Sequence, residues 1–408
     1  MRKGINCCQL LIIAIFLVPQ CQALPPRSGP DGRVRVLYLG DPISLGYITP
    51  YMFMMVEPLI DVTPVIASEI VATYYFGMEG HDMVARAIRL YIPRTYKRLV
   101  EDKDVIVLSD ATLTTLTTNH VAWMARSVLE EGLGLMMAGG VESYYSGGWH
   151  VTVVEDILPV ESVMRSTEGG FGRVLEPDHE LMSSIPWRDG GFGRVPIGGS
   201  NEVALRPGAT ELMRLEITSG GFNPMMCTHD IGEGRTFAFS PDWTWGWGYA
   251  FSLWEYYGDF ANNLMLFLAR QRVPQDIELL HAARKELLKL DISRGLLISL
   301  FDFVEKFGAN TAPLEKMLDE VDLLRREAEE HYIGYAFDDA LEITKHAIEA
   351  AERAEQEAVR LKNSALFWIY IIEWFVVTAT SLITGVVVWT LMVRRRYFKE
   401  IRSTRFIK

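Results

Sequence analysis

The chain has 408 residues, of which 49% are hydrophobic and 23% are charged, and its formal net charge is −12 at pH 7. This length is enough for one α/β domain with a helical region beside it. The acidic balance argues against a nucleic-acid partner, because nucleic-acid binding depends on lysine and arginine neutralising phosphates.

The N-terminus has the pattern of a secretory signal. Arg2 and Lys3 precede a short apolar run, Leu10–Val18, and small residues follow it. This order is typical of a signal peptide, so we expect residues 1–23 to be one. Two alternatives stay open, a retained membrane helix, for which the run is short, and a lipidated Cys21.

The next part of the chain predicts a parallel sheet. Arg33–Gly40 and Asp104–Asp110 are β-branched runs that read as buried strands. Asn119–Glu131 has helical spacing of apolar residues, and Gly132–Gly140 is a further short apolar strand. Strand, helix and strand with short joints form a βαβ unit and hence a parallel pair.

Two later segments complete this domain. Gly234–Ser240 reads as another strand and Phe260–Arg270 as an apolar helix. We therefore expect residues 24–272 to form a doubly wound, mostly parallel α/β domain of the flavodoxin-like kind.

Helix formers dominate after Pro274. Ile277–Phe307, Leu314–His331 and Phe337–Lys362 are each expected to be helical. We interpret residues 273–364 as a helical stalk, with a dedicated binding module as the alternative.

The C-terminal region predicts one membrane span. Leu366–Val393 is dominated by apolar residues with Glu373 as its single charge, and a span needs about 20 apolar residues. We expect residues 365–393 to be this transmembrane helix and residues 394–408 a cytoplasmic tail.

The charge of the tail gives the orientation. Seven lysines and arginines follow the span, against one acid, Glu400. The excess of positive charge predicts a cytoplasmic C-terminus and an extracytoplasmic domain, and hence a single-pass protein of the cell membrane. Removing the six excess charges of the tail and the two of the signal from −12 leaves about −20 for the remainder, a balance compatible with cationic ligands.

Cysteine and histidine usage is sparse. Three of the four cysteines lie in the signal segment, so Cys227 alone remains in the mature chain and no intrachain disulfide is expected. The eight histidines are scattered, without pairs at metal-ligand spacing. No Lys-bearing phosphate loop follows the first strand. We expect neither a metal nor a cofactor.

Several motifs of the α/β part resemble one known family. The segments that carry the resemblance are Gly132–Gly140, Glu142-Ser143, Gly147-Gly148-Trp149-His150, Ile157–Val160, Gly232–Arg235 and Phe239–Asp242. Together they are similar to the glutamine amidotransferase-like domains of the class I superfamily, over roughly residues 33–272. The resemblance implies the fold, and the superfamily name does not specify a reaction.

Amidotransferases of this superfamily use a cysteine thiolate as the nucleophile. The cysteine lies on a sharp strand-to-helix turn, and a histidine activates it. The resemblance makes Leu135–Ala138 the corresponding strand, and no cysteine follows it. Cys227, His229 and Asp230 are neighbours in a strand-like segment, where i and i+2 share a face and i+3 points away. They are therefore not expected to form a triad.

A candidate site lies at the carboxyl edge of the predicted sheet, where ligands bind in such folds. Its catalytic candidates are His150, Glu142 and Asp110, with Asp41 on the same edge. Its ligand-binding candidates are Gly139, Gly140, Gly148 and Trp149. The alternative is an emptied cleft that loop side chains fill.

An aromatic row is the second candidate surface. Trp243, Trp245 and Trp247 alternate with small residues, so an extended backbone would place them on one face. Such a row suits a protein partner or a carbohydrate. Packing against the sheet edge or the stalk is the alternative.

We predict a membrane-anchored, extracytoplasmic amidotransferase-like domain that binds a ligand or protein partner in a cell-envelope assembly without catalysis. The alternative is an extracytoplasmic hydrolase or transferase that acts on a carbohydrate or an amide at the Gly139–His150 edge. The missing nucleophile favours the first function, and the glycine-rich edge favours the second.

Overall fold

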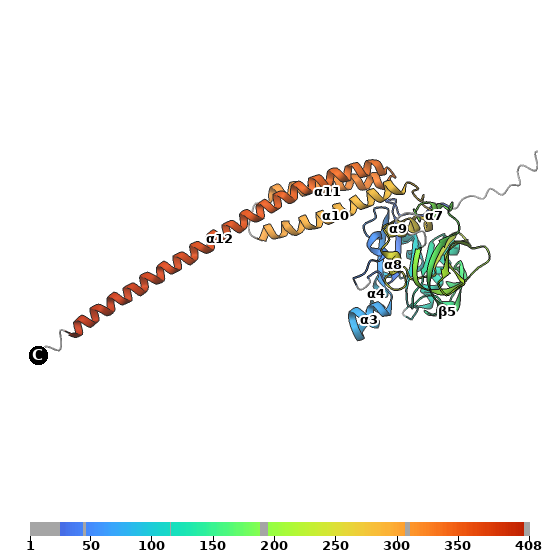
Figure 1. Ribbon diagram of the computed structural model, residues 1–408, viewed down its shortest axis with the longest axis horizontal. Helices are drawn as coiled ribbons and strands as arrows, with labels where there is room; N and C mark the ends of the chain where they lie inside the picture. The colour runs from blue at the N-terminus through green and yellow to red at the C-terminus, as the bar shows by residue number, and fades with distance from the viewer. Residues whose placement is uncertain (1–24, 44–45, 115, 188–194, 307–310, 404–408) are drawn as a thin grey trace, which may run out of the picture. The chain divides into compact units, whose positions relative to one another are not determined.

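The computed structural model describes residues 25–43, 46–114, 116–187, 195–306 and 311–403 (Figure 1). The expected signal peptide, residues 1–23, lies outside them. Two compact units follow one another along the chain, Met1–His281 and Ala282–Lys408.

The first unit is built on one sheet of nine described strands in the order β2-β1-β3-β4-β9-β8-β7-β5-β6. The strands are β1 (Val34–Gly40), β2 (Ile60–Ile66), β3 (Val105–Ser109), β4 (Gly134–Ala138), β5 (Val160–Val174), β6 (Val195–Leu205), β7 (Thr210–Ile217), β8 (Phe222–Ile231) and β9 (Gly234–Phe239).

One half of the sheet, β2-β1-β3-β4-β9, is parallel. β3 and β4 are buried along their whole length, which explains why their sequences are unbroken apolar runs. The carboxyl ends lie level, because Ser109 pairs with both Gly40 and Ala138. Strands β2 and β3 flank β1 on opposite sides, so the topological switch point lies between β1 and β3.

The other half, β9-β8-β7-β5-β6, is antiparallel. The sheet is therefore mixed, whereas we expected a mostly parallel one. The physical reason is the short connections, since tight turns can join only antiparallel neighbours. Gly220 and Gly221, both with positive φ, turn the chain between β7 and β8, and Gly232 with Glu233 connects β8 to β9.

Helices lie on both faces of the sheet in this unit. They are α2 (Pro50–Met54), α3 (Glu69–Phe76), α4 (Gly80–Tyr91), α5 (Tyr96–Asp102), α6 (Thr118–Glu131), α7 (Glu180–Ser183), α8 (Tyr249–Ser252) and α9 (Tyr257–Leu268), with short 3-10 turns η2 (Gly77–Glu79), η3 (Trp149–Val151) and η4 (Glu155–Ile157).

The alternation of side chains along the strands divides the core. Leu37, Ile106 and Leu135 share one core cluster with apolar residues of α4, α5 and α6. The opposite face packs on α9, every residue of which is buried. The Phe260 ring of α9 lies 6.5 Å from the Phe239 ring of β9. The sheet is thus covered on both faces, and its carboxyl edge is left for loops.

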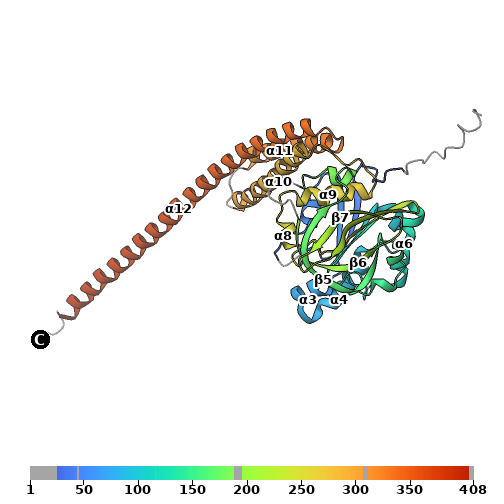
Figure 2. The ribbon, with the colours of Figure 1, turned by 45° about the vertical axis from the view of Figure 1, so that its right-hand side comes forward.

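The second unit consists of helices α10 (Ile277–Lys306, which begins before the unit boundary), α11 (Ala312–Ile333) and α12 (Phe337–Ser403), side by side in Figure 2. Leu290 of α10, Val321 of α11 and Ala347 of α12 share a buried cluster. A second cluster joins Leu297 and Leu314 to further alanines of α12. These small side chains on α12 let the three helices approach closely.

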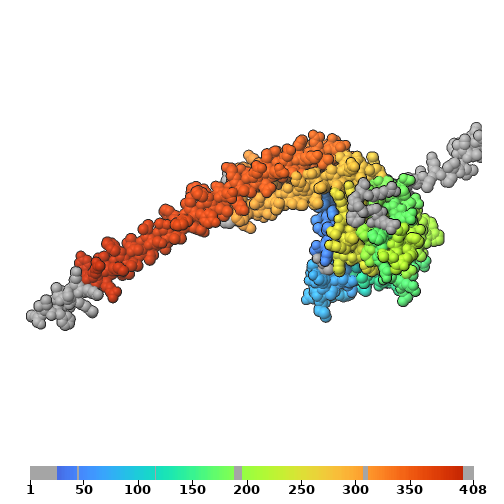
Figure 3. All heavy atoms as spheres, viewed as in Figure 1, coloured from blue at the N-terminus to red at the C-terminus, as the bar shows by residue number. Residues whose placement is uncertain are grey.

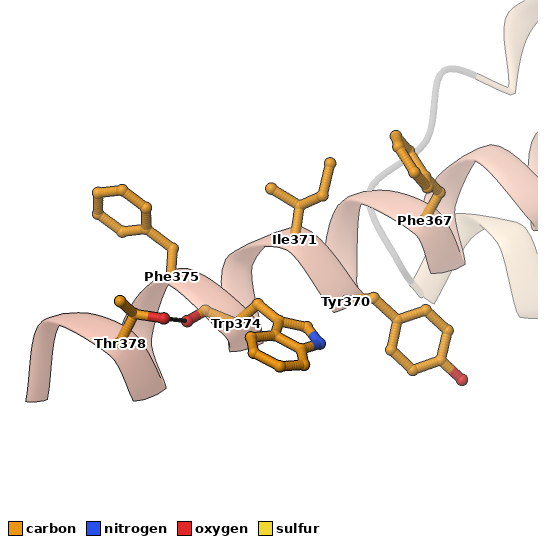
Figure 4. A pocket seen from close by; sticks show the side chains of 6 residues that line it. All are labelled: Phe367, Tyr370, Ile371, Trp374, Phe375 and Thr378. Carbon is orange, nitrogen blue, oxygen red and sulfur yellow. Dashed lines mark hydrogen bonds between the residues drawn. The ribbon is translucent and has the colours of Figure 1, made fainter. Parts of the chain in front are cut away.

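Helix α12 is continuous from the bundle into the apolar run. Among the described residues it is the one helix long and apolar enough to cross a membrane. The apolar stretch of this helix is exposed within the described part of the chain, and Figure 3 shows it extending beyond the other two helices. Aromatic side chains begin the run (Figure 4), and Thr378 Oγ1 donates to the Trp374 carbonyl at 2.7 Å. Tyrosine and tryptophan at this position are typical of a membrane interface.

Candidate functional site

Three aspartates follow the ends of parallel strands at the switch point. Asp41 comes directly after β1, Asp110 directly after β3, and Asp242 shortly after β9. Asp41 and Asp242 are buried, and Asp110 is partly exposed. The level strand ends bring these side chains together although they lie up to 201 positions apart in the sequence.

Two hydroxyl groups link the cluster. Ser109 Oγ donates to Asp41 Oδ1 at 2.6 Å. Thr244 Oγ1 lies 2.9 Å from Asp41 Oδ2 and 2.8 Å from Asp242 Oδ1. A hydroxyl has one proton to donate, so Thr244 can donate to only one of these two carboxyls. The other contact requires a protonated carboxyl that donates to Thr244 Oγ1. The geometry therefore places one proton on the Asp41–Asp242 pair.

Burial explains why these carboxyls hold protons. It raises the pKa of Asp41 well above its ordinary value, and the charges of Asp242 and Asp110 raise it further. Burial also raises the pKa of Asp242, although backbone N–H groups of its own loop oppose the shift. Removing a carboxylate from water disfavours the charged form, and neighbouring carboxylates add repulsion.

Two aromatic rings lie beside these carboxyls. Trp243 is fully buried and stacks on Tyr38 with ring centroids 6.3 Å apart. Its indole Nε1 donates to Ser109 Oγ at 2.8 Å, and its carbonyl accepts a bond from Tyr257. The hydroxyl of Tyr38 is buried without a hydrogen-bond partner among the described residues. Burial and then the charge of Asp41 raise its pKa, and the nearby side chains of Ser109 and Trp243 oppose this shift, which places the hydroxyl close to the cluster.

Asp110 has an unusual backbone. Its φ is +46°, a left-handed conformation that a residue with a side chain seldom adopts. The conformation aims its carboxyl at the next strand end, where Oδ1 accepts a bond from the Glu142 N–H at 2.5 Å and lies against Gly140. Burial, and then the charge of Asp242, raises the pKa of Asp110 to about 8.

Glu142 has a structural partner of its own. Its carboxylate accepts bonds from Ser68 Oγ at 2.5 Å and from the Glu69 N–H at 3.1 Å. These groups form the start of α3, so Glu142 caps that helix and meets its positive dipole end. Burial raises the pKa of Glu142, and the hydrogen bonds oppose this shift.

His150 does not join the other two catalytic candidates. It is exposed on η3, and its ring stacks on Tyr145 with centroids 4.0 Å apart. Neighbouring Trp149 is buried, with Nε1 donating to the Ala111 carbonyl at 2.9 Å, and Gly148 provides a positive φ of 79°. Asp110 and Glu142 meet through a backbone bond, whereas the His150 ring faces a tyrosine.

The glycine pair after β4 serves close packing. The Gly139 N–H donates to the carbonyls of Phe239 and Pro241, both at 2.8 Å. The Asn201 amide exchanges two bonds with the backbone of Gly140, at 2.9 and 3.2 Å. A Cβ on Gly139 would collide with the Ser240 carbonyl, so only glycine fits here. Gly139 and Gly140 thus hold the two halves of the sheet together beside the aspartates.

The tryptophan row is bent rather than extended, so its members face different surroundings. Trp243 belongs to the buried cluster, and Trp247 packs against Gly199 of β6. Trp245 is half-buried and stacks on exposed Tyr47 with centroids 5.7 Å apart and planes 14° from parallel. Exposed Tyr249 meets the Tyr47 ring edge-on at 6.0 Å. The three rings Tyr47, Trp245 and Tyr249 form what we call the aromatic platform.

Cys227 lies in the antiparallel half of the sheet. It is buried in β8, paired in register with Ala238, and burial raises the pKa of its thiol. Asp230, three residues later, is held by Arg235 at 2.7 Å. Within the described ranges, no group of three histidine, cysteine or acidic side chains has an arrangement that could hold a metal ion.

The sequence singled out Asp41 and Asp110 but not the roles of Asp242 and Thr244. An aspartate after the expected strand Gly234–Ser240 was the available signal, by analogy with the first two strand ends. The contact between Thr244 and Asp41 spans 203 positions, and no local pattern reports it.

Comparison with known proteins supports the domain. Residues 76–270 match the family model described as "Putative glutamine amidotransferase". None of the curated proteins matches the chain.

Several solved structures are similar. Two cytoplasmic proteins from Salmonella typhimurium are 18% and 20% identical, each with a TM-score of 0.43; the matches cover 58% of this chain and 98% and 99% of theirs. A GH42 β-galactosidase from G. stearothermophilus is 13% identical with a TM-score of 0.30, over 59% of this chain and 31% of its own. Similarities at this level carry no information on activity. The family match is the finding that supports a glutamine amidotransferase-like domain in this chain.

Proposed function

We propose that this chain is a single-pass membrane protein whose amidotransferase-like domain lies outside the cytoplasm and binds a ligand or protein partner in a cell-envelope assembly, without amidotransfer. One observation carries the proposal. At the end of β4, where the resemblance places the nucleophile cysteine, the chain has Gly139 and Gly140, and the neighbouring strand ends provide three aspartates, a serine and a threonine.

The chemistry of Cys227 supports the non-catalytic part. A nucleophilic cysteine must reach its substrate as a thiolate. Cys227 is buried in the middle of β8, and burial disfavours its thiolate. A buried cysteine of this kind behaves as a small apolar residue.

The membrane part rests on α12 and on charge. An apolar helix followed at once by Arg394, Arg395 and Arg396 fits a span with its basic end in the cytoplasm. The acidic excess of the remaining chain fits the opposite side of the membrane.

One observation favours the second function, a hydrolase or transferase. A partly exposed acid with a pKa of about 8 suits general acid catalysis near neutral pH. The placement of His150, stacked on Tyr145 and away from Asp110, makes this reading the weaker of the two.

Two measurements on the full chain test the proposal. Cysteine is introduced at Met78, which is fully exposed, and expressing cells are treated with a membrane-impermeant maleimide. Labelling of intact cells is expected for Met78→Cys, and labelling only after lysis for a cysteine added after Lys408. Labelling at Met78 only after lysis would overturn the topology.

The purified protein is then assayed for ammonia release from glutamine. We expect no turnover above buffer, with and without Cys227→Ala. Turnover that Cys227→Ala abolishes would overturn the non-catalytic proposal.

A further inference from the structure

Two of the three loops that assemble the aspartate cluster also assemble the aromatic platform. The loop after β1 contributes Asp41 and Tyr47, and the loop after β9 contributes Asp242 and Trp245. Thr244 joins the loops through its contacts to both carboxyls, and the Tyr47–Trp245 stack joins them a second time. Carboxyls and exposed rings are thus parts of one structure.

The cluster has no cationic partner within the described part of the chain. None of Asp41, Asp110 and Asp242 has an ion pair with lysine, arginine or histidine there. Asp104, just before β3, shows how a buried carboxylate is usually compensated by a cation. It is buried and pairs with Arg35, Nη2 to Oδ1 at 2.9 Å and Nε to Oδ2 at 2.9 Å. Buried carboxylates are normally compensated in this way.

A second observation also points to an absent partner. The Tyr38 hydroxyl beside the cluster is completely buried and makes no hydrogen bond of normal geometry among the described residues, although Ser109 and Trp243 lie close to it. A buried hydroxyl without a well-formed hydrogen bond destabilises a fold, so such groups call for an explanation.

Access to the cluster lies through Asp110 and Gly246. Asp110 is its partly exposed member. Exposed Gly246 carries no side chain over the cluster, and a Cβ there would lie 2.5 Å from Asp242 Oδ2. Trp245 of the platform directly precedes Gly246 on this loop, and its stacking partner Tyr47 is 44% exposed.

We propose that this edge binds a small organic ammonium ion, whose charge lies at the Asp110 carboxylate and whose carbon skeleton lies on the aromatic platform. The proposal rests on the proposed ligand-binding function and names its ligand class. Carboxylates and aromatic faces both attract an ammonium group. An organic cation uses both parts of the site, whereas the described carboxyls lack a metal-binding arrangement.

The test is calorimetric titration of the full chain in detergent with choline and with its neutral isostere 3,3-dimethyl-1-butanol. Glucosamine and glucose form a second pair of an ammonium probe and its neutral analogue. In this pair a sugar ring replaces the methyl-bearing skeleton of choline. At least one ammonium probe is expected to bind at least tenfold more tightly than its neutral partner.

Two variants locate the binding. Asp110→Asn and Trp245→Ala are each expected to weaken the ammonium probe at least tenfold. Asp156→Asn replaces an exposed carboxylate of η4 by the same amide and is expected to leave affinity unchanged. Circular dichroism verifies that each variant is folded, and the two site variants probe the carboxylate and the ring independently.

The proposal is overturned if neither ammonium probe binds at 10 mM, if the neutral partners bind equally well, or if both site variants retain full affinity. Such a result leaves the topology and glutamine assays unaffected. Conversely, cytoplasmic labelling or glutamine turnover would overturn the proposed function whatever the probes do.

Discussion

Replacing Asp110 by asparagine should make the protein more stable at pH 8. Asparagine keeps an Oδ1 that can accept the Glu142 N–H, and it tolerates the positive φ of this position. What it removes is a carboxyl whose pKa is about 8 in the folded chain, against an ordinary value of 3.8.

The sign of the effect follows from proton binding. Below about pH 4 the group is protonated in both states and contributes no pH dependence. Between pH 4 and 8 the unfolded chain loses the proton while the folded chain keeps it, so the folded state loses stability as pH rises, and above pH 8 the loss is constant. About four pKa units at 1.36 kcal/mol each set a ceiling of about 5 kcal/mol, and partial exposure of the group reduces it.

The assay is urea unfolding of the full chain in detergent at pH 5, 6, 7 and 8, for the wild type and Asp110→Asn. Tryptophan fluorescence follows the transition of the α/β unit. The stability advantage of the variant should grow steadily over this range and reach a few kcal/mol. Asp242 and Asp110 repel each other when both are ionised. Part of the gain in stability of the variant therefore comes from removing this repulsion. A constant advantage, or none, would refute the assignment of a high pKa to Asp110.

Three further predictions concern the groups around the cluster. Tyr38→Phe should stabilise the chain by about 1 kcal/mol, because the lost hydroxyl makes no well-formed hydrogen bond. Tyr257→Phe should destabilise it by about 1–2 kcal/mol, because the lost hydroxyl donates to the Trp243 carbonyl. Equal effects of the two variants in urea unfolding would contradict this. Glu142→Ala should destabilise the chain by about 1–2 kcal/mol and speed hydrogen exchange at the first amides of α3; unchanged exchange would show that Glu142 is not the cap. Asn201→Ala should destabilise it by about 2–3 kcal/mol through two unpaired backbone groups of Gly140, and a loss under 0.5 kcal/mol in the same assay would mean that water replaces the amide.

The inner strands of the parallel half were predicted from the sequence because they are largely buried, whereas the partly exposed edge strand β2 was not predicted. Arg33–Gly40 and Asp104–Asp110 were predicted within a residue of β1 and β3 at each end. The antiparallel half was not, because β5 mixes glycines, charges and apolar residues and one side of it faces solvent. Such strands lack the continuous apolar signal on which the prediction depended.

The candidate site was likewise predictable only in part. The strand-end position of Asp110 follows from local sequence, and so does its nearness to the glycine-rich edge. The shared proton of Asp41 and Asp242 depends on one threonine placed by a distant loop. The expected single face of the tryptophan row depended on an extended backbone, and the chain bends there instead.

The cluster lowers stability in the free protein, and this is the strongest physical reason to assign it a ligand. Binding sites commonly retain groups that weaken the fold. If an ammonium ion meets Asp110, binding must expel the proton that Asp110 holds below pH 8, beside Asp41, Asp242 and Glu142 as the neighbouring titratable groups. The affinity for choline, whose charge does not change with pH, should therefore rise from pH 6 to 8.

The rise should approach tenfold per pH unit, because one proton is released for each ligand bound. Stability should fall over the same interval, so one carboxyl would produce two opposite slopes. In Asp110→Asn both slopes should flatten together. An affinity that stays constant while stability falls would place the ammonium group elsewhere on the edge and separate the pKa of Asp110 from ligand binding.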